Sequence, residues 1–269
     1  MDERPAKPPA RSARRRVRLG EQDIELLWFL AEHRMVLPDH AASLLGTTVQ
    51  TAKVRLAKLV SAGYVTRAPL FRKQPPMHLI AGAGLAVIGS RLPTPQIDVH
   101  SYVHDVGVAW LWLAARHGAF GPLLEVTGER RLRSHDAARD PGTEPLAVKL
   151  GGAGPRGGER LHYPDLLLRT DGGPRIALEL ELSSKGRVRL EKILAGYASD
   201  PRIDGVVYLV QTAAVGRSVQ AAARRLGLAP LVHIQRVRCT ATSPAAVEAH
   251  DAARAVPSRR GRTGPETAR

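Results

Sequence analysis

The sequence predicts a mixed α/β (α+β) protein, and two patterns in the chain carry that prediction. From residue 20 to residue 63, apolar residues recur at the spacing of one helix face. From residue 166 to residue 237, short apolar strand-like runs alternate with helical runs, which is typical of a mixed sheet with helices packed on it. The chain has 269 residues, 43% of them hydrophobic, which suits two modest domains or one large one.

The chain is expected to divide into segments. Residues 1–19 and 241–269 are rich in Arg and Pro and show no apolar period, so we predict disordered basic arms there. Such arms are either simply solvated or seek phosphate groups. A first folded unit is expected over residues 20–80, a helical connector over 81–122 and a second folded unit over 123–240.

The charge balance favours a polyanionic partner. The formal net charge is +15 and the isoelectric point is near 10.9, and nucleic acid is the polyanion that we favour. A GC-rich genome would also raise the Arg content, so composition is a second explanation. The sequence has no apolar run of 18 residues and no signal-peptide core, and Cys239 has no second cysteine to pair with. We therefore expect a cytoplasmic protein that does not enter a membrane.

The first folded unit begins with two predicted helices. The first is expected over residues 21–33. Its apolar face consists of Ile24, Leu27, Trp28 and Ala31. Pro38 is placed to open a short second helix, because proline is tolerated in a first turn, and Gly46 ends that helix.

A third helix is expected over residues 47–63, with Thr47 or Thr48 as its cap and Gly63 at its end. One face is apolar. The other face carries candidate DNA-binding residues, namely Gln50, Thr51, Lys53, Arg55 and Lys58. Two short strand-like pieces then flank a basic loop, whose candidate DNA-binding residues are Arg67, Arg72 and Lys73.

Three helices with a short middle one, followed by a basic hairpin, predict a winged helix-turn-helix. In that arrangement the third helix enters the major groove of duplex DNA and the hairpin touches the backbone. One alternative is a small helical bundle with a solvated charged face. Another is a protein-interaction module with the same fold.

Two further motifs are open to more than one interpretation. His100 and His104 are four residues apart, so on a helix they share a face, either as metal ligands or as ordinary helix histidines. Gly152, Gly154 and Gly157 match a dinucleotide-binding pattern. Because the residues that follow offer no helix start, we interpret this stretch as a loop.

A carboxylate-bearing hairpin is expected in the second unit. A strand over residues 166–169, the turn TDGGP and a strand over residues 176–182 place Glu179 and Glu181 on the face opposite the leucines. If the turn is centred on Gly172, Asp165 lies directly across from Glu179, and a divalent cation with oxygen ligands would relieve their repulsion.

Two alternatives compete with the metal-site interpretation of this hairpin. A register shifted by one residue would put Asp165 on the other face. A solvated sheet face would leave the acids exposed to water. The nearby cations Lys185, Arg187 and Arg189 could neutralise them there. After the hairpin we expect a helix, a buried strand, a helix and a final strand.

Asp165 after a proline, followed by a strand and Glu179-Leu180-Glu181, resembles the core of the PD-(D/E)XK nucleases. Glu181 stands where that pattern usually has lysine, and Lys185 stands further along. Over residues 20–240 the order of motifs is similar to the replication-relaxation proteins of bacterial plasmids and integrative elements. The motifs are RLAKLVSAGYV, GERRLR, YPDLLL, ALELELSSKGRVRLEKILAGY and GVVYLV.

The resemblance implies a DNA-binding protein that acts in replication or maintenance of a mobile element. Its implied partners are double-stranded DNA, replication or conjugation proteins and a second copy of the chain. If the nuclease-like site is active, Asp165 and Glu179 would hold Mg²⁺, and Glu181 would either complete the metal shell or take a proton from the bound water. Lys185 would stabilise charge on the phosphate. Glu129 is either a further acidic ligand or a salt-bridged surface residue.

Two other functions compete with a non-catalytic replication or maintenance factor. One is an Mg²⁺-dependent DNA endonuclease or nickase that uses the carboxylates of the hairpin. The other is a winged-helix transcriptional regulator whose second domain mediates dimerisation.

Overall fold

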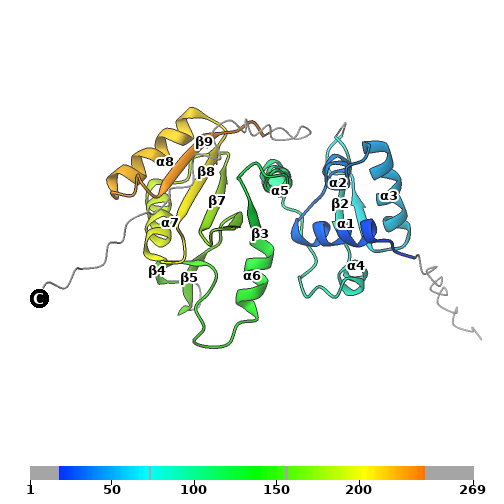
Figure 1. Ribbon diagram of the computed structural model, residues 1–269, viewed down its shortest axis with the longest axis horizontal. Helices are drawn as coiled ribbons and strands as arrows, with labels where there is room; N and C mark the ends of the chain where they lie inside the picture. Colours follow the sequence, from blue (N-terminus) through cyan, green and yellow to red (C-terminus); the bar gives the residue numbers. More distant parts are fainter. Residues whose placement is uncertain (1–17, 73, 155–156, 240–269) are drawn as a thin grey trace, which may run out of the picture.

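The fold is mixed α/β, as predicted. The computed structural model describes residues 18–72, 74–154 and 157–239 (Figure 1). Lys73 and most of the two predicted basic arms lie outside these residues. Within the described ranges the chain forms eight α-helices, a five-stranded mixed sheet and two short hairpins. In these ranges no helix has the length and apolar character needed to cross a membrane.

The N-terminal unit contains the three predicted helices and the predicted hairpin. The helices are α1 (Glu21–Glu32), α2 (Pro38–Leu44) and α3 (Val49–Ser61), and the strands are β1 (Val65–Ala68) and β2 (Met77–Ile80). β1 and β2 are antiparallel. Val36 adds a backbone bridge to His78 on the other edge of β2, with N–H···O distances of 2.9 and 2.8 Å.

Short local signals explain where α2 and α3 begin and end. Pro38 occupies the first turn of α2, where its missing N–H costs nothing. Gly46, at φ +59°, turns the chain toward α3. The Thr48 hydroxyl accepts the Thr51 N–H at 3.1 Å and caps α3, so Thr48 is the cap.

The connector is less helical than the sequence indicated. α4 (Gly82–Val87) is short, and residues 89–98 form no helix. A 3₁₀ turn (Val99–Ser101) then leads into α5 (Tyr102–Arg116). α5 is apolar nearly all round, because it lies between the N-terminal unit and the sheet (Figure 1).

The sheet has the strand order β3-β6-β7-β8-β9. The strands are β3 (Leu123–Gly128), β6 (Leu166–Thr170), β7 (Arg175–Glu181), β8 (Gly205–Val210) and β9 (Val232–Arg236). β3, β6 and β7 pair antiparallel, whereas β7, β8 and β9 pair parallel through the helices α7 (Arg187–Ser199) and α8 (Ala213–Arg225). The predicted order from β6 to β9 is therefore confirmed, whereas β3 and the helix α6 (Glu129–Ala137) were not predicted.

The glycine-rich stretch that was expected to be a loop lies at the tip of a second hairpin. β4 (Val148–Ala153) and β5 (Glu159–His162) pair antiparallel, so Gly152 lies in a strand. The Gly154 N–H donates to the Gly158 carbonyl at 2.6 Å close to the turn, where Gly157 has φ +76°. The loop prediction therefore holds for Gly154 and Gly157, which lie between the two strands, and is wrong for Gly152.

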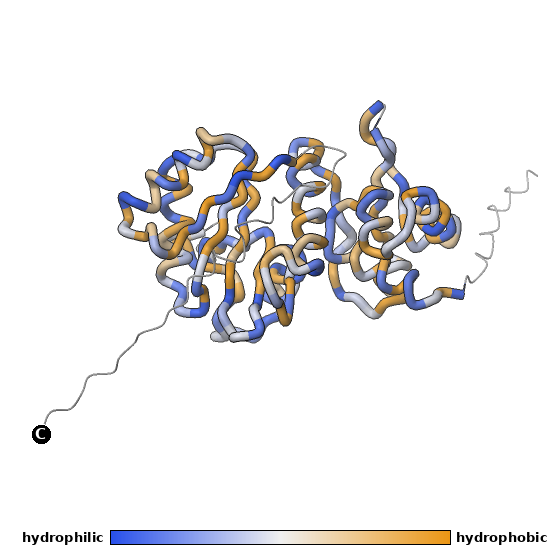
Figure 2. Tube along the Cα trace, turned by 45° about the horizontal axis from the view of Figure 1, so that its top comes forward, coloured by the Kyte–Doolittle hydropathy of each residue, from blue (hydrophilic) through white to orange (hydrophobic). Residues whose placement is uncertain are grey.

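Two cores lie on the two faces of the sheet. The first is continuous from the N-terminal helices through α5 to the leucine face of β7, including Leu178 and Leu180. The second lies under α7 and α8 and includes Tyr197 and Tyr208. Figure 2 shows hydrophobic residues concentrated along the central strands. α5 approaches β7 so closely that a Cβ on Gly107 would lie 2.6 Å from the Leu180 side chain.

Candidate functional site

The acidic hairpin has the predicted register. Leu166 pairs with Leu178 and Leu168 pairs with Ile176, so the turn is centred on Gly172. Continuing this register by one residue places Asp165 opposite Glu179. The alternative of a register shifted by one residue is therefore wrong.

The acids of this hairpin are buried, not solvated. Glu179 is 3% exposed and Glu181 is 5% exposed, although both lie on the face opposite the leucines as predicted. β7 is a central strand covered on both faces, so water does not reach these carboxylates. The solvated-face alternative is wrong, and each buried charge needs a partner inside the protein.

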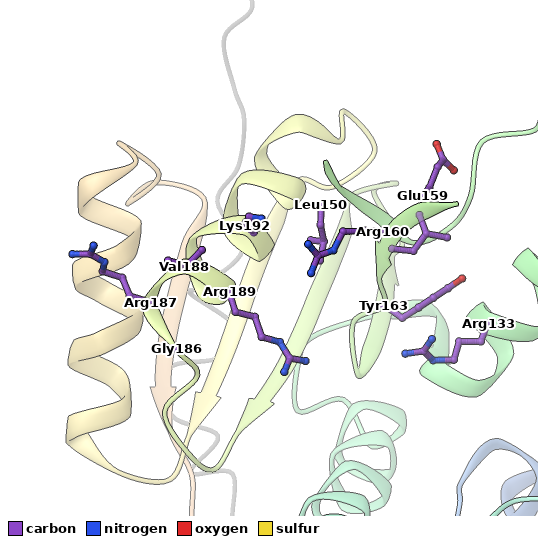
Figure 3. A pocket seen from close by; sticks show the side chains of 11 residues that line it. Arg133, Leu150, Glu159, Arg160, Tyr163, Gly186, Arg187, Val188, Arg189 and Lys192 are labelled. Carbon is purple, nitrogen blue, oxygen red and sulfur yellow. The ribbon is translucent and has the colours of Figure 1, made fainter. Parts of the chain in front are cut away.

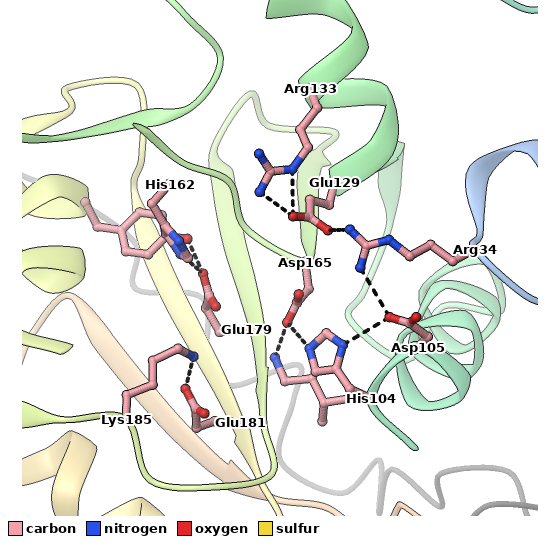
Figure 4. Close-up of polar contacts among 12 residues, drawn as sticks. Arg34, His104, Asp105, Glu129, Arg133, His162, Asp165, Glu179, Glu181 and Lys185 are labelled. Carbon is pink, nitrogen blue, oxygen red and sulfur yellow. Dashed lines mark hydrogen bonds and ion pairs between the residues drawn. The ribbon is translucent and has the colours of Figure 1, made fainter. Parts of the chain in front are cut away.

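Asp165 is held by His104. Its Oδ2 accepts the Leu180 N–H at 2.8 Å and lies 3.2 Å from His104 Nε2 (Figure 4). Burial opposes the charge of both side chains. Asp165 and Asp105 nevertheless raise the pKa of His104 to about 10, and His104 and the Leu180 N–H lower the pKa of Asp165. At neutral pH the two side chains therefore form a charged pair.

Glu179 is held by two aromatic side chains. Its Oε1 accepts the Tyr197 hydroxyl and lies 2.7 Å from His162 Nε2. Tyr197 is fully buried in α7, and burial together with Glu179 raises its pKa well above the ordinary value, so it stays a donor. His162 and Tyr197 pack with their rings nearly perpendicular.

Glu181 is held by Lys185. The Lys185 ammonium forms an ion pair with Glu181 Oε2 four residues earlier, and it is 20% exposed. Burial raises the pKa of Glu181, and Lys185 only partly offsets this. The lysine that the nuclease resemblance assigns to the phosphate is therefore occupied by a carboxylate of the same site.

Each of the three acids has its own internal partner. In the described part of the chain, no three His, Cys, Asp or Glu side chains are grouped around a common point as metal ligands would be. Asp165, Glu179 and Glu181 each turn an oxygen toward an internal donor instead (Figure 4). Mg²⁺ held by Asp165, Glu179 and Glu181 would require these acids to exchange their internal donors for the cation.

The partners of the acids were not predicted as a group. His104 was noted only with His100, which is exposed in the 3₁₀ turn before α5. His162 lies in the LHYPD stretch just before Asp165, and Tyr197 follows from the helical period of α7. No local signal identified these donors as a group, because the burial of β7 on both faces depends on elements that are distant in the sequence.

Glu129 is a salt-bridged residue, as one alternative proposed. It begins α6 and contacts Arg133 at 2.7 Å and Arg34 at 2.9 Å. Arg34 also lies 3.5 Å from Asp105, next to His104 (Figure 4). Arg34 follows α1, so this network ties the N-terminal unit to the sheet.

The predicted DNA-binding residues separate into two groups. Arg55 and Lys58 each lie 2.7 Å from the carboxylate of Asp23, which is 1% exposed. The pKa of Asp23 is lowered, because these two cations and the Gly20 N–H outweigh the effect of burial. Arg55 and Lys58 therefore fix α3 to the start of α1, a role that the sequence did not indicate.

The remaining candidates present free polar groups. Gln50, Lys53, Arg67 and Arg72 are exposed, and none of them has a side-chain partner among the described residues. Thr51 is exposed as well, and its hydroxyl lies 3.0 Å from that of Thr48.

Comparisons of the chain with family models, with curated proteins and with solved structures found no match.

Proposed function

We propose that this chain is a DNA-binding protein that reads duplex DNA with α3 and contacts the backbone with the β1–β2 hairpin. The observation that carries the proposal is the outer face of α3. Its exposed positions follow the helical period, and they are Gln50, Thr51, Lys53, Val54, Ala57, Lys58 and Ser61. Figure 1 places α3 at the end of the described chain away from the sheet.

The chemistry of the outer face suits base edges as well as phosphates. Gln50 can form paired hydrogen bonds with an adenine, and Lys53 can bind guanine or phosphate. Val54 is 63% exposed, and its methyl groups suit contact with the thymine methyl group. Val54 was not among the sequence-based candidates, which are all polar or charged residues.

The hairpin supplies cations beside this helix. Arg67 lies in β1 and Arg72 lies in the loop between β1 and β2, and both are exposed. Phosphate contacts of this kind position a protein on duplex DNA and make its affinity depend on salt. A role in replication or maintenance of a plasmid or integrative element is part of the proposal, and it rests on the order of motifs from residue 20 to residue 240.

Removing the free cations tests the DNA-binding surface. The triple variant Lys53→Ala, Arg67→Ala, Arg72→Ala is expected to bind a labelled duplex on the order of 100-fold more weakly at low salt, at about 1 kcal/mol per lost phosphate contact. The slope of log affinity against log salt concentration should fall by nearly one for each lost contact. Fluorescence anisotropy over a salt series measures both quantities.

A charge-matched variant controls for the loss of positive charge. Arg217→Ala, Arg224→Ala, Arg236→Ala removes three exposed cations from α8 and β9 and should retain most of the affinity. Equal losses in the two triple variants would overturn the proposed surface. Arg55 and Lys58 are left intact, because their replacement would disturb the contact with Asp23.

Mg²⁺-dependent DNA cleavage is an alternative proposal, supported by the register that sets Asp165 opposite Glu179. A plasmid-nicking assay with Mg²⁺ or Mn²⁺ tests it. If the wild type cleaves DNA and Glu179→Gln does not, the result would favour the endonuclease alternative. No metal-dependent cleavage by the pure wild type would rule this alternative out.

A further inference from the structure

A basic cavity lies between the β4–β5 hairpin and the start of α7. Its volume is about 900 Å³ (Figure 3). Arg160 and Leu161 of β5 line one wall, and Arg187, Val188, Arg189 and Lys192 of α7 line another. The cavity is separate from the outer face of α3, which belongs to the other end of the molecule (Figure 1).

Four of the cations that line this cavity are free. Arg160, Arg187, Arg189 and Lys192 have no hydrogen-bond or ion-pair partner in the described part of the chain. Most other charged residues of the second unit are paired, including the neighbouring Arg133, which contacts Glu129 and covers the Tyr163 ring at 4.3 Å. Free cations gathered around one hollow repel each other, and a multiply charged anion would relieve that repulsion.

The acid beside the cavity does not supply this charge. Glu159 lies 3.0 Å from Lys149 and 3.4 Å from Arg139, so its carboxylate is already engaged. Arg187 and Arg189 also lie in the first turn of α7, which contains no acidic residue. The helix dipole disfavours cations at that end, so these two arginines cost stability where they stand unless an anion is bound.

The cavity also has an apolar wall. Leu150, Leu161 and Val188 line it together with the Tyr163 ring, and Val188 is 62% exposed. A site that bound only phosphate groups would have no use for such a wall. The volume lies in the range of pockets that hold small organic ligands. An arginine guanidinium can donate two parallel hydrogen bonds to the oxygens of one phosphate group.

We propose that this cavity binds a nucleoside di- or triphosphate. The phosphates lie among Arg160, Arg189 and Lys192, with Arg187 at the edge of the cavity, and the base and sugar lie against Leu161 and Val188. This ligand is distinct from the duplex DNA proposed for α3, so either assignment can fail while the other holds.

Binding of a fluorescent ATP analogue, N-methylanthraniloyl-ATP, to the full chain tests the proposal. At physiological salt we expect saturable binding with one site per chain. The double variant Arg187→Ala, Arg189→Ala should weaken binding of the analogue at least about tenfold, and so should the single variant Arg160→Ala. The double variant should fold normally, because it removes cations from a helix N-terminus. Arg217→Ala, Arg224→Ala removes two exposed cations of α8 outside the cavity and should leave the affinity unchanged.

Competition experiments decide which chemistry is recognised. Unlabelled ATP should displace the probe at lower concentration than inorganic tripolyphosphate does, because the apolar wall contacts the base and sugar. Equal competition by tripolyphosphate would overturn the nucleotide assignment. Displacement by a single-stranded oligonucleotide but not by ATP would overturn it in favour of a nucleic-acid strand. Non-saturable binding, or equal loss in the α8 control, would overturn the site itself.

Discussion

Replacing Glu179 with alanine is expected to lower the free energy of unfolding by about 3 kcal/mol. Glu179 is 3% exposed and accepts from the Tyr197 hydroxyl and His162, so its removal leaves two polar groups without their acceptor. Tyr197 is fully buried, so water cannot replace the lost contact. Urea denaturation followed by circular dichroism measures the change.

Glu179→Gln is the matched control. It keeps a side-chain oxygen at the same place, so we expect a loss of only about 1 kcal/mol. Tyr197→Phe should abolish much of the difference between the two Glu179 variants, because the donor that needs the acceptor is then gone. If alanine and glutamine at position 179 gave equal stability, the hydrogen bonds of Glu179 would not be what holds β7 to α7.

Comparing Glu179→Ala with Glu179→Gln also distinguishes a loss of stability from the loss of a chemical role of the carboxylate. Any loss of function in Glu179→Ala would combine an unfolding effect with a chemical one. Glu179→Gln removes the charge and keeps the fold, so it is the variant that reports on a chemical role of the carboxylate.

Much of the hairpin could be predicted from the sequence, because its signals are local. The period of two between Leu178 and Leu180, and the turn at Gly172, set which face each side chain takes and which residues oppose each other. Burial could not be predicted in this way. It depends on covering elements such as α5, whose His104 contacts Asp165 from 61 positions away in the chain.

The same distinction explains the errors in the N-terminal unit. The helical period correctly separates the apolar and polar faces of α3, because it is a property of one helix. The helical period cannot show that Arg55 and Lys58 form ion pairs with Asp23, which lies more than 30 positions away in α1. β3 was missed for a related reason, since it is an edge strand that carries polar residues such as Glu125 and Thr127.

Acid is expected to unfold the protein through histidines buried in the neutral state. His33 and His40 lie in the core among Phe29, Trp110 and Trp112. Burial lowers the pKa of each histidine to about 3 from an ordinary 6.5, and His40 adds to the effect at His33. Between those values the unfolded chain binds protons that the folded chain does not, so stability falls as pH falls below 6.5.

The expected loss between pH 7 and pH 5 is about 2 kcal/mol for each of these two histidines, at roughly 1.4 kcal/mol per pH unit. His104 acts in the opposite sense. Its pKa is raised to about 10, so its contribution is full below pH 6.5 and is lost as pH rises toward 10. Stability should therefore decline on both sides of neutrality, more steeply on the acid side.

Urea denaturation at pH 7 and pH 5 measures this dependence, and one substitution isolates its cause. His33→Phe keeps an aromatic ring beside Phe29 and Trp112, and it should reduce the loss between the two pH values by about 2 kcal/mol, whatever it does to stability at pH 7. His100→Gln changes an exposed histidine and should leave the loss unchanged. An unaltered loss in His33→Phe would mean that the loss between these two pH values comes from other groups, such as His40 and His78, whose pKa values burial lowers to about 3 and about 4.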